Sequence, residues 1–292
     1  MNNHVLNLVN DLETVQMESQ LSIYSAIGDQ LVKEYYLEQA GIVIESDTML
    51  GLKQDGSVPT LQKIANWFSR LIQKAMTYLT KRHIDKVIKK IRESERYQNN
   101  DEYDLLLIDN EWYQQNVVNV MNIHASLSNA IIADKAQNDG VAKVITILGS
   151  AKFSSVVRTM HKLREDSQEA YDEVKSISSI GNTKEQTTRH MKNVSKATID
   201  DLLEMIEKEN ETLTDRLKLM HDSINFVKET ADYLSSENLN MKKNNDLKKE
   251  QYVKFITDAG KVALLLAMIQ SKVVDRIKYS IGAVHAGGGN NV

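Results

Sequence analysis

Apolar residues recur with helical spacing along most of the chain, and the clearest case is the stretch 58–96. Intervals of three and four residues place its apolar positions on one face of a helix. These positions are Leu61, Ile64, Phe68, Leu71, Ile72, Ala75, Leu79, Ile84, Val87, Ile88 and Ile91. Pro59 stands where the first turn of a helix tolerates proline. The pattern therefore predicts one amphipathic helix over residues 58–96.

The same periodicity predicts long helices in the rest of the chain. They are expected over residues 5–40 (as one helix or two), 105–180, 184–240 and 246–284. Gly149 is expected to bend or break the second of these, and the polar residues 242–245 are expected to form the turn before the last. Apolar steps of three and four over 184–240 favour coiled-coil-like packing in an antiparallel pair of helices.

Glycine and proline, which normally end helices, are scarce, since the 292 residues contain 12 glycines and 1 proline. No strong run of alternating apolar and polar residues with a hairpin turn interrupts the helical pattern. The predicted class is all-α, with long antiparallel helices forming an elongated helical bundle. An N-terminal helical arm with its hinge is expected over residues 1–57, and the all-helical body over residues 58–292.

Charge is divided unevenly between the arm and the helix that follows it. Residues 1–50 contain eight acidic residues and one lysine, a net charge of −7. Residues 58–96 contain ten basic and three acidic residues, a net charge of +7, although the whole chain carries −4. The acidic arm and the basic helix can therefore pair within the molecule, or each can bind a partner of its own.

The basic residues of this helix are candidate contacts to DNA or to another acidic partner. They are Lys63, Arg70, Lys74, Lys81, Arg82, Lys86, Lys89, Lys90 and Arg92. The aromatic residues Trp67, Phe68 and Tyr78 lie among them, and a tryptophan at the border of a cationic face suits a membrane interface or packing against a partner protein. The simpler interpretation is that the cations form the solvated face of a bundle helix.

The sequence contains no motif that supports catalysis or metal binding. None of its seven histidines pairs with another histidine or with an acidic residue at a metal-like spacing that recurs, and no cysteine is present. Nucleotide-binding glycine loops and the Gly-x-Ser-x-Gly motif are also absent. His124, on an apolar stripe, is expected to be a core or boundary histidine. We therefore expect a non-enzymatic protein without cofactors or metals.

The sequence shows neither a signal peptide nor a membrane-spanning helix. The first 20 residues contain three acidic residues and no lysine or arginine. The longest apolar run, residues 262–269, is too short to span a bilayer as a helix. A role at a membrane would require this run to insert as part of an amphipathic hairpin.

Three pieces follow one another over residues 10–95: an acidic helix VQMESQLSIYSAIGDQLVKEYYLEQAG, a short patch IVIESD, and the basic helix ANWFSRLIQKAMTYLTKRHIDKVIKKI. This order resembles the structural or internal head proteins of large tailed bacteriophages. The resemblance implies a virion protein made in the cytoplasm of the host bacterium, with an N-terminal segment that addresses it to the growing head. It also implies cleavage by a prohead protease between Glu45 and Ser46, since Val43 and Glu45 partly match the protease pattern.

Three functions remain compatible with these features. The first, which we expect, is a non-enzymatic structural or assembly component of a tailed-phage virion. Such a component would bind other virion proteins, further copies of itself or packaged DNA through its helical faces. The second is a helical pore-forming or membrane-active protein that uses the apolar run 262–269. The third is a helical scaffold or adaptor built on residues 184–284.

Overall fold

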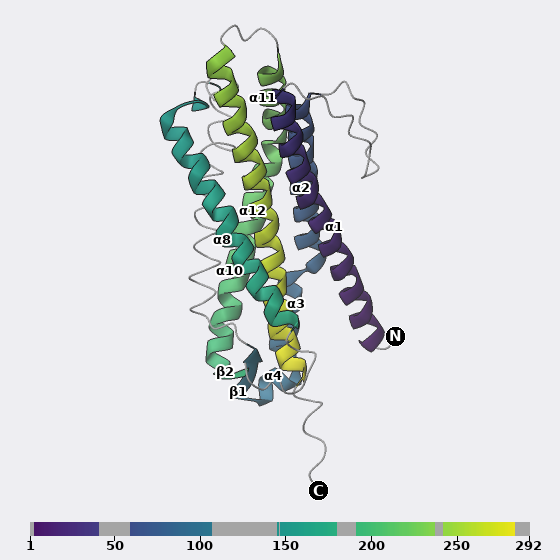
Figure 1. Ribbon diagram of the computed structural model, residues 1–292. Coiled ribbons are helices and arrows are strands. Elements are labelled where there is room, and N and C mark those ends of the chain that lie inside the picture. The colour runs from purple at the N-terminus through teal and green to yellow at the C-terminus, as the bar shows by residue number, and fades with distance from the viewer. Residues whose placement is uncertain are drawn as a thin grey trace. The chain divides into compact units, whose positions relative to one another are not determined.

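The computed structural model describes residues 3–40, 59–106, 145, 147–179, 191–236 and 242–283. These residues form mostly long helices (Figure 1), and the predicted all-α class is confirmed. The helices are α1 (Asn3–Gln39), α2 (Thr60–Arg82), α3 (Ile84–Glu93), α4 (Glu95–Asn99), α8 (Ala151–Ser179), α10 (Lys196–Asp222), α11 (Ile224–Ser235) and α12 (Lys242–Ala283). The arrangement of these helices as one elongated bundle stays a prediction.

The break predicted at Gly149 is confirmed. Gly149 has φ +91°, a conformation that glycine adopts at little cost, and α8 begins two residues later. The Gly149 N–H donates to the side-chain oxygen of Gln251 at 2.8 Å. Ser150 then caps the helix, because its Oγ accepts the N–H of Phe153 at 3.1 Å. This junction fixes the start of α8 against α12.

The prediction of one continuous helix over residues 58–96 is wrong, since the structure has three helices in this stretch. α2 ends because His83 adopts φ 47° and ψ 50°, a left-handed conformation that histidine tolerates better than most residues. Ser94 separates α3 from α4, and its Oγ accepts the Tyr97 N–H at 3.3 Å as a helix cap. The apolar periodicity continues across His83, which is why the sequence does not reveal that break.

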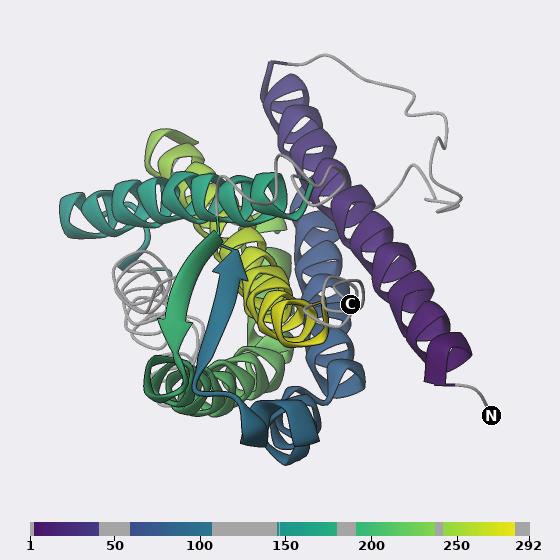
Figure 2. The ribbon, with the colours of Figure 1, turned by 90° about the horizontal axis from the view of Figure 1, so that it is seen from below.

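A two-stranded antiparallel sheet joins two distant parts of the chain. Strand β1 (Glu102–Leu106) pairs with β2 (Met191–Ser195), as Figure 2 shows. In this pairing Tyr103 stands opposite Val194. The Tyr103 ring stacks on Tyr97 of α4 with 5.4 Å between the ring centroids. Its hydroxyl donates to the backbone oxygen of Tyr97 at 2.7 Å, which anchors the strand to the preceding helix.

The helices predicted over residues 105–180 and 184–240 are therefore wrong over the strand residues. The second is also wrong in its continuity, since Ser223 separates α10 from α11. Strands of five residues carry too little periodicity to compete with a helical pattern, and their pairing partner is remote in the sequence.

The turn predicted over residues 242–245 is also wrong, because α12 begins at Lys242. The first turn of a helix accepts polar residues readily, since its N–H groups have no partner within the helix.

The chain divides into two compact units. Unit 1 comprises Met1–Ala75, His124–Arg164 and Lys218–Leu264. Unit 2 comprises Met76–Ile123, Glu165–Leu217 and Leu265–Val292. The division of the chain into an arm over residues 1–57 and a body over residues 58–292 stays a prediction.

The middle of α12 is buried in both units. In unit 1 every residue over 251–264 except Lys254 is buried, and in unit 2 every residue over 265–271 is buried. A helix that is apolar on nearly every side belongs in a core. In unit 1, Phe255 packs on Phe153 of α8, and Gly260 lets the Leu71 side chain of α2 approach the helix backbone closely.

Candidate functional site

The structure describes the side chains of seven of the nine basic residues that the sequence singles out. Those exposed to solvent are Arg70, Lys86, Lys89 and Lys90. Those that are half-buried are Lys63, Lys74 and Arg92. The side chains of Lys81 and Arg82 lie outside the described residues. Lys63, Arg70 and Lys74 belong to unit 1 and the other four to unit 2, so the set is divided between the two units.

Two of these cations pair with acidic residues of the same chain. The Lys63 Nζ lies 3.7 Å from the Glu34 carboxylate of α1, and both side chains are 12% exposed. Arg92 donates from Nη1 to the Glu207 carboxylate of α10 at 3.0 Å. Lys63 thus pairs with the acidic arm, as one alternative from the sequence expects. Both residues are poor candidates for contacts to a separate acidic partner.

The lysines of α3 remain directed to solvent. Ile84, Ile88 and Ile91 bury one side of this helix, while the α3 lysine face, defined as Lys86, Lys89 and Lys90, is exposed. Lys89 is paired with Glu93 at 3.7 Å, but these side chains are 75% and 62% exposed, so solvent screens the interaction. Lys86 and Lys90 have no ion pair among the described residues. The α3 lysine face therefore keeps most of its positive charge.

The aromatic residues among the cations are buried rather than placed at the border of a cationic face. Trp67, Phe68 and Tyr78 are 4%, 0% and 1% exposed. The Trp67 indole N–H donates to the backbone oxygen of Tyr24 in α1 at 2.7 Å. The interpretation of Trp67 as a membrane-interface residue is therefore wrong, because α1 covers its ring and satisfies its polar atom.

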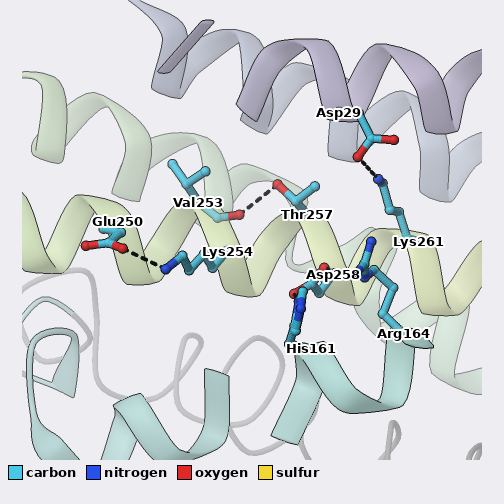
Figure 3. A network of polar contacts seen from close by, with 9 residues as sticks. All are labelled: Asp29, His161, Arg164, Glu250, Val253, Lys254, Thr257, Asp258 and Lys261. Carbon is cyan, nitrogen blue, oxygen red and sulfur yellow. Dashed lines mark hydrogen bonds and ion pairs between the residues drawn. The ribbon is translucent and has the colours of Figure 1, made fainter. Parts of the chain in front are cut away.

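A charged network that the sequence did not suggest surrounds two buried charges of α12 in unit 1 (Figure 3). Asp258 of α12 is 7% exposed and faces α8, where one carboxylate oxygen lies 3.0 Å from His161 Nδ1 and the other 3.2 Å from Arg164 Nε. Burial raises the pKa of the Asp258 carboxyl, although its hydrogen bond to His161 and the charge of Arg164 act in the opposite direction. These contacts compensate the cost of burying the carboxylate.

Lys261 extends the network to α1. Its side chain is buried, and its ammonium group binds the carboxylate of Asp29 on α1 (Figure 3). The available sequence signal was a pair of opposite charges, Asp258 and Lys261, three residues apart and directly before the apolar run 262–269. Charges within an apolar stretch of helix usually have partners on neighbouring helices.

The described residues show no arrangement that would hold a metal ion, as judged by clusters of three or more His, Asp or Glu side chains. No described helix contains a continuous apolar stretch of the length that a bilayer span requires. The apolar run 262–269, which the membrane-active alternative requires, is buried over its whole length in α12. The candidate cleavage residues Glu45 and Ser46, and also His124, lie outside the described residues.

Comparisons with protein-family models, with curated proteins and with solved structures find no match to this chain.

Proposed function

We propose that the protein is a non-enzymatic structural or assembly component of a tailed-phage virion, and that it binds packaged DNA or acidic virion proteins through the α3 lysine face. The order of pieces over residues 10–95 supports the virion role by resemblance. The observation that carries the binding role is that Lys86, Lys89 and Lys90 stay exposed after other cations have paired within the chain.

The spacing of these lysines suits a phosphate backbone. Positions i, i+3 and i+4 lie on one side of a helix, and four residues advance by about 6 Å along its axis. Duplex DNA carries one negative charge per about 1.7 Å of its axis, so three ammonium groups in this space can neutralise neighbouring phosphates. Such contacts release counterions and depend on salt, and they are independent of base sequence.

DNA affinity as a function of salt tests the binding role. The triple variant Lys86→Glu, Lys89→Glu, Lys90→Glu is compared with the parent chain by fluorescence anisotropy on duplex DNA. For the parent chain, the logarithm of the binding constant is expected to fall linearly with the logarithm of the salt concentration. The variant is expected to bind more weakly, with a slope smaller by up to about 3, since each lost phosphate contact removes about 0.9.

A matched control distinguishes DNA binding by the α3 lysine face from a general effect of the net charge. Lys152, Arg158 and Lys162 are exposed on α8, and changing all three to glutamate alters the charge by the same amount. This control is expected to retain most of the affinity. Unchanged binding in the α3 variant, or an equal loss in the α8 control, would contradict DNA binding by the α3 lysine face.

The virion role has its own test. Mass spectrometry of purified particles of the phage that encodes this chain is expected to find its peptides in the particle. An N-terminal peptide that begins at Ser46 would report the implied cleavage after Glu45. Absence of the chain from the particles would contradict the virion role while leaving the DNA measurement unaffected.

A further inference from the structure

α1 contacts the other helices of unit 1 through a narrow stripe of its surface. Of its described side chains, Gly28, Leu31 and Tyr35 are buried, at the three- and four-residue spacing of one helix face. On the same helix Ile23 and Tyr36 are 45% and 42% exposed. Most of the described surface of α1 therefore takes no part in the core of unit 1.

The surface that α1 contacts is specific in shape. Gly28 lies directly against the Trp67 ring of α2, where a Cβ atom would come within 2.5 Å of Cζ2. One turn earlier in α1, the backbone oxygen of Tyr24 accepts the Trp67 indole N–H at 2.7 Å. A helix that binds here must therefore present glycine at one position and an accessible carbonyl four residues before it.

The same surface is specific in charge. Lys63 of α2 pairs with Glu34 of α1. Lys261 of α12 pairs with Asp29 of α1 (Figure 3). We call Lys63, Trp67 and Lys261 the α1-binding surface. It fits a helix that carries Gly-Asp and, five residues after the aspartate, a glutamate, as the sequence 28–34 does.

We propose that the α1-binding surface also accepts α1 of a second copy of this chain, so that two copies exchange their N-terminal helices. A second copy provides the same glycine, carbonyl and carboxylates, so the exchanged helix makes the contacts of the original one. Residues 40–59 separate α1 from α2 and can extend to about 70 Å at about 3.3–3.6 Å per residue. The chain can therefore reach a neighbour. This proposal is independent of the virion role.

Crosslinking between two single-cysteine chains tests the exchange. The chain contains no cysteine, so Glu34→Cys and Lys63→Cys each introduce a unique reactive site. The two variants are purified separately, mixed, incubated and treated with a short bismaleimide. The expected product is a covalent dimer in which peptide mass spectrometry finds residue 34 linked to residue 63. Its yield should rise with protein concentration.

The control pair replaces Glu34→Cys by Ser22→Cys, also in α1 and exposed, but about 18 Å along the helix from position 34. This pair is expected to give no link to residue 63. A chain that carries both Glu34→Cys and Lys63→Cys reports binding of α1 to its own surface. Exchange would be overturned if this double variant links within one chain while the mixed single variants give no 34–63 link.

A second substitution connects the crosslink to the α1-binding surface. Gly28→Leu in the Glu34→Cys chain places a large side chain against Trp67, and circular dichroism verifies that the helices are retained. The mixed 34–63 link is expected to be lost. A link of unchanged yield would overturn the proposal, because α1 of the second copy would then bind without the contact that defines the surface.

Discussion

Replacing Gly28 by alanine tests the contact between α1 and Trp67 with the smallest possible perturbation. The added Cβ would lie 2.5 Å from Cζ2 and 2.9 Å from Cε2 of the ring, well inside the roughly 3.5–4.0 Å at which carbon atoms pack best. The ring has little room to move, because Trp67 is 4% exposed and also packs beside Gly260 of α12. The methyl group must therefore push α1 away or strain the core.

Two opposing effects decide the sign of the change in stability. Alanine favours the helix over glycine by about 0.8–1.0 kcal/mol. Overpacking a well-packed core costs about 1–3 kcal/mol. The net expectation for Gly28→Ala is a decrease of up to about 2 kcal/mol in the free energy of unfolding. With no close contact at Trp67, the same substitution would instead stabilise the protein by about 1 kcal/mol.

Urea unfolding followed by circular dichroism measures the change. The control is Ala26→Gly, two residues away at an exposed position of α1, which reports helix propensity without packing. It is expected to destabilise by about 0.8–1.0 kcal/mol. The reasoning is refuted if Gly28→Ala stabilises the protein by the amount that Ala26→Gly destabilises it, because the packing cost would then be zero.

Two further predictions concern buried carboxyl groups. Burial raises the pKa of Glu209 in α10, so the folded state holds this proton more tightly than the unfolded state, and stability falls as pH rises through the folded pKa. Glu209→Gln is therefore expected to stabilise the protein at pH 7 and to have little effect near pH 4 in urea unfolding, while the exposed Glu211→Gln changes neither value. His161→Ala removes a hydrogen bond that lowers the pKa of Asp258, so that pKa should rise further in carboxyl carbon-13 NMR. An unchanged titration would contradict the geometry of the network.

The helical class could be predicted because it depends on a local pattern. Of the apolar positions that the sequence assigns to one face of residues 58–96, all are buried except Val87, which is half-buried. The breaks could not be predicted in the same way. His83 ends α2 through its backbone conformation, and the stripe resumes at Ile84 without a shift that the sequence would show. β1 and β2 stabilise each other only after distant parts of the chain have met.

The candidate site was harder to predict, because exposure depends on partners that are remote in the sequence. Lys63 and Lys89 look alike in the basic helix, yet Lys63 meets Glu34 of α1 and Lys89 stays in solvent. Trp67 stands between basic residues and would be a border residue if α1 were absent. Gly28 covers the Trp67 ring, but nothing in the sequence around Gly28 indicates that Trp67 is its contact.

The charges of α12 explain how a helix buried on nearly every side keeps one orientation. Burial alone does not select one rotation, since residues 251–264 are buried almost all round. Asp258 and Lys261 are three residues apart, so they project in directions about 60° apart, the first toward α8 and the second toward α1 (Figure 3). Turning α12 by one residue, about 100°, would separate both pairs and leave a buried carboxylate and a buried ammonium without partners. Each such ion costs several kcal/mol, which is comparable to the stability of a whole domain. The network thereby selects one rotation of α12, and with it the position of the Gly260 contact beneath Trp67.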